Sequence, residues 1–439
     1  DGTTTVLGDR AIGIETGNVS GNVRLAGSVT AQGVNAIGAA FNGNIGGTLT
    51  IQGTIIGTGY RYATPPSDVS KLDADDLLQG GPGVVIGGNV AGGIILAVPP
   101  KDASSTDNDE DKDGIEDSKE GSAIVRSYGA ARAMRIASAT QDITIGAVPG
   151  TGSGYGLIID GGIAGNGLYS GIASRGLEVG GMGRSVDIVG GIGIAGTVSA
   201  TANGASATAL RLSDGASTPV IQVGSTGKIE ASGGNAIGNI ATGILVSDGA
   251  VLPGIRNAGS IKATAGGENG TAAAILDLSG TVSLVENSGA ISATGAKADS
   301  GRNVAIDISE NTTGAIIRQT AVAAGVTAPS ITGNVHFGTG NNLFDIADGT
   351  VTGDTYFGAG DDTLKLTGDA VYSGTVNFGR GAAAMSLAGT SQFKGTANFR
   401  GGASTLNVGT GSVFTGSLVE ANNLAETLAG GALDLSAPA

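Results

Sequence analysis

The stretch 331–408, ITGNVHFGTGNNLFDIADGT VTGDTYFGAGDDTLKLTGDA VYSGTVNFGRGAAAMSLAGT SQFKGTANFRGGASTLNV, decides the fold. A phenylalanine recurs in it about every 20 residues, at Phe337, Phe357, Phe378 and Phe399. Each has a glycine four residues before it and apolar residues seven and nine after it. A unit of this length is one turn of a solenoid, which buries its apolar side only by stacking on its neighbours.

A second repeat, with a longer step, occupies the middle of the chain. Segments of the form Gly-x-Ile/Val-x-Ala recur about every 31 residues, beginning at Gly196, Gly227, Gly259 and Gly289. Gly27 begins a similar segment, and each middle segment is followed by an apolar run at 209–212, 243–246, 274–278 or 305–308. Because the apolar residues keep a fixed register, these units are not a low-complexity linker. We interpret each as one larger coil with a protruding loop, or as one coil and part of the next.

Composition supports a thin core rather than a wide globular one. The chain has 439 residues with 82 glycines, 40% apolar residues, only 3% aromatics and no cysteine. Small and β-branched side chains suffice for the narrow core of a solenoid, and disulfides play no part. The net charge of −15 disfavours binding to nucleic acid and to anionic membranes. The most apolar run, 84–98, is too short and glycine-rich to span a bilayer as a helix, and no signal peptide is expected in this chain.

Two polar, proline-containing segments interrupt the pattern, and we expect them to leave the stack as loops. The segment 419–439 loses the repeat and is predicted to be a cap or linker, with a short helix or cap at 420–429. The predicted organisation is: N-terminal coils at 1–59, a Pro/Asp loop at 60–82, strands at 83–98, an acidic loop at 99–122, central coils with the longer unit at 123–330, C-terminal coils with the shorter unit at 331–418, and the tail at 419–439.

The middle segments 257–265 and 287–295, together with the Phe-Gly-x-Gly coils, resemble passenger domains of bacterial autotransporters (type V secretion). The resemblance implies an all-β fold, a right-handed parallel β-helix, here with two protruding loops. It also implies export through the outer membrane of a Gram-negative cell to an extracellular or cell-surface location. Passengers of this family include adhesins, self-association factors, proteases, esterases and toxins, so the resemblance does not select an activity.

The acidic loop contains a calcium-type spacing. Counted from Asp109, carboxylates stand at positions 1, 3, 5, 9 and 12, and a glycine stands at position 6. Alternate side-chain oxygens then converge on a hard cation, the glycine makes the turn, and a final glutamate closes the shell. The alternative is a solvated acidic loop. We predict a structural calcium site with the following ligands: Asp109, Asp111, Asp113, the Ile115 carbonyl, Asp117 and Glu120.

Catalytic signals are weak. His336 is the only histidine and occupies an outward, variable position of the repeat, so a Ser/His/Asp triad is not expected. Segment 357–364 resembles one RTX calcium repeat, but the neighbouring copies lack its ligands, which favours a glycine corner. Asp361, Asp362 and the group Asp73, Asp75 and Asp76 are candidates for polysaccharide cleavage by residue type alone.

These observations favour a secreted or cell-surface structural solenoid rather than an enzyme. We expect it to act in self-association, as a fibre or coat, or in adhesion to surface glycans or other cells, without inserting into a membrane. The alternative is a carbohydrate-active β-helix, a polysaccharide lyase or hydrolase. At about 22 residues per coil, roughly 20 rungs and a rod of about 90–100 Å are expected.

Overall fold

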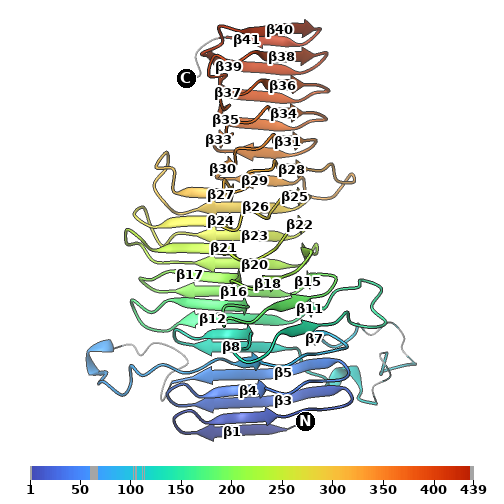
Figure 1. Cartoon of the computed structure of the whole chain (residues 1–439), viewed down its shortest axis with the longest axis vertical. Coiled ribbons are helices and arrows are strands. Elements are labelled where there is room, and N and C mark those ends of the chain that lie inside the picture. Colours follow the sequence, from blue (N-terminus) through green and yellow to red (C-terminus); the bar gives the residue numbers. More distant parts are fainter. Residues whose placement is uncertain are drawn as a thin grey trace.

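The computed structural model describes residues 2–59, 68–101, 103, 106–110, 112 and 114–435. The chain winds into a parallel β-helix, with the coils stacked along one long axis (Figure 1). Within the described residues there is no α-helix, and the two helical turns are the 3₁₀ segments η1 (Val69–Lys71) and η2 (Asp117–Lys119). The expected all-β solenoid is therefore confirmed.

Strand pairing defines three faces of the β-helix, and all pairings between the named strands are parallel. The first face consists, in order, of β1 (Thr3–Leu7), β3 (Val23–Gln32), β5 (Leu49–Thr58), β8 (Ile124–Tyr128), β12 (Gly162–Gly167), β16 (Thr197–Ala202), β20 (Lys228–Ser232), β23 (Ser260–Thr264), β26 (Ala290–Thr294), β29 (Ser330–Thr332), β32 (Thr350–Thr352), β35 (Val371–Asn377), β37 (Gln392–Asn398), β39 (Val413–Val419) and β41 (Ala432–Asp434).

Some long strands of the first face also contribute to another face. At the C-terminal end of the stack, the C-terminal halves of β35, β37 and β39 complete the second face, and at the N-terminal end the N-terminal halves of β3 and β5 begin the third. The second face contains β2 (Ile12–Thr16), β4 (Ile37–Phe41), β6 (Val84–Ile86), β9 (Arg132–Ile136), β13 (Ser174–Val179), β17 (Ala207–Leu212), β21 (Ile240–Val246), β24 (Thr271–Asp277), β27 (Asn303–Ile308), β30 (Asn334–Phe337) and β33 (Thr355–Tyr356). The third contains β7 (Ile94–Leu96), β11 (Leu157–Ile159), β15 (Ile192–Ile194), β19 (Val220–Val223), β22 (Gly254–Asn257), β25 (Leu284–Asn287), β28 (Ile316–Gln319), β31 (Leu343–Ile346), β34 (Asp362–Leu366), β36 (Ala383–Leu387), β38 (Ser404–Gly409) and β40 (Leu424–Ala429). A small separate sheet joins β10 (Ile143–Ile145), β14 (Val186–Ile188) and β18 (Ala216–Ser217).

Both sequence repeats correspond to successive coils. The residues that follow the four middle glycines are direct register partners, as in Thr197 with Lys228 and Lys228 with Ser260. Each of the longer middle units is therefore one complete coil, which resolves the two alternatives left open by the sequence. The segment after Gly27 lies in the same column, because β3 leads by successive pairings to β16.

The core is a narrow column of apolar side chains whose size depends on the coil. One inward column of the first face is fully buried along its length, with successive members Val29, Ile55, Val125, Ile163, Val198, Ile229, Ile261, Ile291, Ile331, Val351, Tyr372, Phe393 and Phe414. In the short C-terminal coils aromatic rings fill this column, where Tyr372 stacks on Phe393 at a centroid distance of 5.2 Å and Phe393 on Phe414 at 4.7 Å. A second column contains the repeated phenylalanines, in which Phe357 and Phe378 stack at 5.2 Å, as do Phe378 and Phe399.

The glycine that precedes each repeated phenylalanine forms a corner between the first and second faces. Gly374 and Gly395 have φ angles of +147° and +150°, in a region that other residues rarely adopt. A Cβ atom on Gly395 would lie 1.9 Å from the carbonyl oxygen of Gly374 in the coil below. The glycine recurs because the rungs approach closely at this corner.

A buried amide ladder fixes the register of three central coils. It comprises Asn257, Asn287 and Gln319, which are register partners on β22, β25 and β28 and are at most 2% exposed. Asn257 Nδ2 donates to Asn287 Oδ1 (2.8 Å), and Asn287 Nδ2 donates to Gln319 Oε1 (3.1 Å). A buried amide side chain costs little free energy only when its donors and acceptors have hydrogen-bond partners. Because these partners lie on the neighbouring rungs, the hydrogen bonds hold the three rungs in register.

Two expectations about the stack need correction. The first face passes through fifteen strands rather than roughly 20 rungs, because the coils before β29 are longer than the average length assumed from the sequence. Fourteen steps of about 4.8 Å give a stack of about 67 Å. In addition, residues 424–429 form strand β40 rather than a helix, and β40 and β41 pair in register on β38 and β39. The backbone pairing continues there although the repeated phenylalanine has ended.

The two polar segments leave the stack. The chain between β5 and β6 and the chain between β7 and β8 contain no strand in their described parts, and they extend to either side of the lower coils in Figure 1. Strands β6 and β7 lie between them and pair with their neighbours as ordinary rungs.

Candidate functional site

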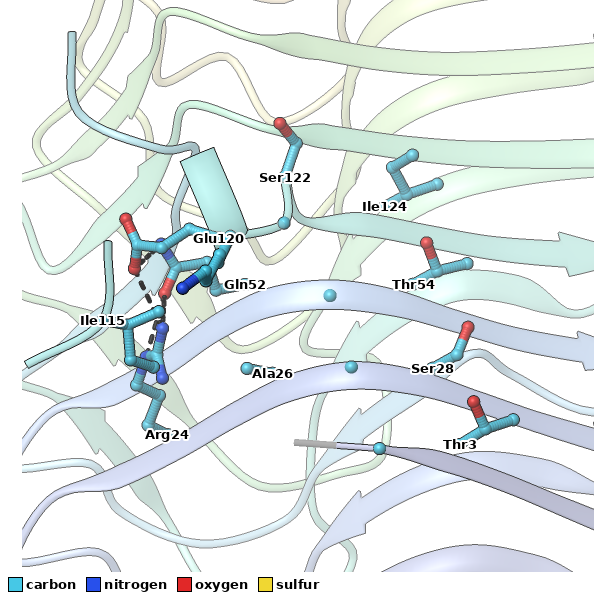
Figure 2. A pocket seen from close by; sticks show the side chains of 15 residues that line it. Thr3, Arg24, Ala26, Ser28, Gln52, Thr54, Ile115, Glu120, Ser122 and Ile124 are labelled. Atoms are coloured by element: carbon cyan, nitrogen blue, oxygen red, sulfur yellow. Dashed lines mark hydrogen bonds and ion pairs between the residues drawn. The ribbon is translucent and has the colours of Figure 1, made fainter. Parts of the chain in front are cut away.

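The acidic loop is fastened to the first coils by a buried polar cluster. The Glu120 side chain is fully buried, and its Oε1 accepts hydrogen bonds from Arg24 Nη2 (2.9 Å) and Gln52 Nε2 (2.7 Å). Arg24 also donates to Gln52 Oε1 from Nε (2.9 Å) and Nη2 (2.7 Å). Figure 2 shows these three side chains converging at the foot of the loop. A charge-assisted network of this kind holds the end of the loop against the third and first faces.

Beside this cluster, the loop and the first face enclose an open groove of about 770 Å³. One wall is a column of the first face, Thr3, Ser28, Thr54 and Ile124, whose side chains are aligned from rung to rung in Figure 2. The loop supplies the other wall, including Ile115, Lys119 and Glu120. Hydroxyl groups, a few methyl groups, the cations Arg24 and Lys119 and the carboxylate of Glu120 line the groove, so it can hold polar ligands.

The described members of the predicted calcium set point to different partners. Asp109 Oδ2 accepts the backbone N–H of Gly114 (3.0 Å), and Gly114 has φ +89°, as expected for the turning glycine. Ile115 lines the groove, and Glu120 contacts Arg24 and Gln52. Asp111 and Asp113 lie outside the described residues. Asp117 is buried. The described residues do not test the complete ligand set, and the site remains a prediction.

Asp117 lies beside Glu110, and both of its carboxyl oxygens and Oε2 of Glu110 are buried. The neighbouring Glu110 carboxyl group, together with burial, raises the pKa of Asp117 to about 6. Two carboxyl groups in such contact need a shared proton or a cation between them. Within the part of the chain that the structure describes, no three His, Asp or Glu side chains come together in a way that could hold a metal ion.

His336 occupies an outward position on the second face, as expected, but it has partners that the sequence reasoning missed. Its Nδ1 lies 3.4 Å from Asp307 Oδ2, and its ring meets Tyr356 edge to face at 5.1 Å. Ser309 Oγ donates to Asp307 Oδ1 (2.6 Å), so the carboxylate stands between the hydroxyl and the imidazole. A nucleophilic triad needs the histidine in the middle. The sequence contained a signal for this contact, because Asp307 and His336 are one coil apart and are direct register partners on β27 and β30.

The remaining acidic candidates are separated by the strand geometry. Asp361 is exposed, and its Oδ1 accepts the N–H of Ala382 (2.8 Å). Asp362 is 1% exposed, and its Oδ1 accepts from the backbone N (3.0 Å) and Nδ2 (2.9 Å) of Asn342. Burial raises the pKa of Asp362 to about 6. The two neighbours therefore face opposite sides of the coil and do not form a carboxylate pair.

The third group of acidic residues folds back on itself. Asp73 and Asp76 each accept the backbone N–H of the other, at 3.4 and 3.3 Å respectively. The hydrogen bond and negative charge of Asp73 raise the pKa of Asp75 above its usual value. These contacts stabilise the turn of a loop that lies outside the stack.

No protein-family model, curated protein or solved structure matches this chain. In its described part, no helix has the length and apolar character needed to cross a membrane.

Proposed function

We propose that this protein is a secreted or cell-surface structural β-helix that acts by adhesion or self-association rather than by catalysis. The observation that carries the proposal is the outward side of the first face, which we term the polar face. It is a continuous surface along the whole stack, and β-helices with such surfaces can make many weak contacts that repeat at the rung spacing.

One outward column illustrates the polar face. None of its members is buried, and only Ile56 and Ala164 are apolar. In order, the column contains Thr5, Thr30, Ile56, Arg126, Ala164, Ser199, Glu230, Lys262, Ser292, Thr332, Thr352, Ser373, Lys394, Thr415 and Asp434. Hydroxyl groups at regular spacing suit the hydroxyl groups of surface glycans or the same face of a second copy.

The geometry of the acidic candidates supports a non-catalytic role. Polysaccharide hydrolysis needs two carboxyl groups on either side of one bond, whereas Asp361 is exposed and Asp362 is buried with Asn342. The alternative function is a carbohydrate-active β-helix. New reducing ends or unsaturated products from acidic polysaccharides, lost in Asp361→Ala or Asp73→Ala, would establish that alternative and overturn ours.

A charge-patterning experiment tests the polar face directly. The triple variant Ser292→Glu, Thr332→Glu and Thr352→Glu places three like charges on successive rungs of this face. A matched control carries the same kind of substitution at three successive outward positions of the third face: Ser386→Glu, Asn407→Glu and Thr427→Glu.

Sedimentation and electron microscopy at high concentration with calcium, together with binding to immobilised glycans and cells, are the readouts. We expect the polar-face variant to lose association or adhesion and the control to retain it. Dispersed single rods that bind no surface, or equal loss in both variants, would refute the proposal.

The resemblance to autotransporter passengers supports an extracellular or cell-surface location, reached by export across a Gram-negative outer membrane. We further propose that calcium orders the acidic loop. The supporting observation is the Asp117–Glu110 pair, in which a cation can replace the shared proton. Its role would be structural, because the loop is already attached to the coils through Glu120.

A further inference from the structure

A cluster of four arginines lies on three neighbouring strands of the second face. Arg132 on β9 is the register partner of Arg175 on β13. On the same strands, Glu178 has Arg135 of β9 on one side and Arg211 of β17 on the other. Since adjacent strands are about 4.8 Å apart, the whole cluster spans two rungs, or about 10 Å. We call Arg132, Arg135, Arg175 and Arg211 the arginine cluster.

The carboxylate that lies among these four arginines, Glu178, already has hydrogen-bond partners. Glu178 is 5% exposed, and it accepts hydrogen bonds from Arg132 Nε and from Ser213 Oγ (2.9 Å). Burial opposes its ionisation, but Arg132 and Ser213 outweigh that effect and hold the pKa of Glu178 below its usual value. Glu178 therefore remains an anion and neutralises one guanidinium.

The other three guanidinium groups have no ion-pair partner in the described part of the chain. Arg175 Nη1 donates to the Ala130 carbonyl (3.0 Å), and Arg211 Nε donates to Ser247 Oγ (3.0 Å). Arg135 makes no hydrogen bond or ion pair there, and its Nε is buried without an acceptor. Four positive charges and one negative charge give the site a local charge of +3, in a chain whose net charge is −15.

This imbalance differs from the way charges are arranged elsewhere on the stack. On the third face an outward column alternates in sign through Arg256, Glu286, Arg318, Asp345 and Lys365. Each cation there pairs with a carboxylate at 2.8 to 3.6 Å. In the arginine cluster, by contrast, burial and the positive charge of Arg132 lower the pKa of Arg135 and Arg175.

We propose that the arginine cluster binds a compact oxyanion of the phosphate or sulfate class, either as the free ion or as a monoester. Arginine presents several N–H donors in a planar fork that matches such groups, and a dianion offsets the positive charge that Glu178 alone does not neutralise. A small ligand is favoured because the acidic remainder of the chain repels long polyanions. This inference does not depend on the adhesive or self-associating role.

Isothermal titration calorimetry of the full chain tests the site with inorganic phosphate, inorganic sulfate and glucose 6-phosphate, at constant ionic strength set with chloride. We expect saturable binding that weakens about tenfold or more in Arg135→Gln and in Arg211→Gln. The control is Lys262→Gln, which removes one exposed positive charge from the first face and should leave affinity unchanged. Tighter binding of glucose 6-phosphate than of inorganic phosphate would identify a monoester as the ligand, and the reverse would identify the free ion.

A second variant should change affinity in the opposite direction. Glu178→Gln removes the only negative charge in the cluster and keeps an oxygen that can accept from Ser213, so phosphate should bind more tightly than to the native chain. Circular dichroism of each variant reports whether the β-helix is retained. Absence of saturable binding in the native chain, equal weakening by Lys262→Gln, or no gain in folded Glu178→Gln would each overturn the proposal.

Discussion

Replacing Asn287 by alanine removes the middle member of the amide ladder and leaves Gln319 Oε1 without its donor. The Asn287 side chain donates to Gln319 Oε1 (3.1 Å) and to the carbonyl oxygens of Gly289 (3.1 Å) and Ser330 (3.2 Å). It accepts from Asn257 Nδ2 (2.8 Å) and the Gly289 N–H (3.2 Å). A buried group left unsatisfied costs about 1–3 kcal/mol, so the buried Gln319 Oε1, with a smaller contribution from the half-buried Gly289 N–H, gives an expected loss of about 3 kcal/mol in local stability.

The assay must report locally, because long repeat arrays do not unfold as one cooperative unit. Hydrogen exchange followed by mass spectrometry gives the opening free energy of β22, β25 and β28 separately from the ends of the stack. The matched control is Asn407→Ala, an exposed asparagine on the third face for which we expect a change within about 0.5 kcal/mol. Equal exchange rates in the two variants at β25 would refute the role assigned to the ladder.

Three further outcomes follow from particular side chains. Phe378→Ala, which removes a ring stacked at 5.2 Å on both sides, should cost about 3–5 kcal/mol in the C-terminal coils by the same exchange assay, whereas exposed Tyr356→Ala should cost far less. The folded state raises the pKa of Asp362 to about 6, so folding favours its protonated form, and the stability of the chain should fall as pH rises from about 4 to 6. Asp362→Asn should remove this pH dependence, and the same pH profile in the variant and the native chain would contradict the prediction. Chelation of calcium should speed exchange in the acidic loop and leave the coils protected, and calorimetry in which the native chain and Asp109→Ala both bind no calcium would exclude the metal.

The repeats made the stack predictable because each coil repeats the same inward positions. The short step between phenylalanines and the longer step between the middle glycines both equal one coil, so residues one step apart became register partners. The number of rungs was overestimated because coil length varies with the loops, and loop length has no periodic signal. The last two strands were not predicted because β40 and β41 form the end of the stack and carry largely exposed side chains. Their sequences therefore lack the repeated buried apolar positions that indicate a coil.

The candidate sites were less predictable, because they depend on contacts between coils and loops. The attachment of Glu120 to Arg24 joins residues 96 positions apart, and no local motif indicates it. A calcium-type spacing assigned Glu120 to a cation, whereas in the structure its Oε1 is held by a guanidinium and an amide from the coils. The arginine cluster was also invisible in sequence, since it arises only when three coils bring their strands into register.

The most direct test of the central claim is a set of distances between spin labels along the polar face, measured by pulsed electron resonance. The chain has no cysteine, so labels can be placed by single substitutions to cysteine at outward positions. From Lys394, Lys262 lies five rungs away and Ser199 seven, which predicts separations of about 24 and 34 Å. Distances that increase by about 4.8 Å per rung agree with a parallel β-helix presenting one continuous face, and distances that do not increase with rung number would contradict it.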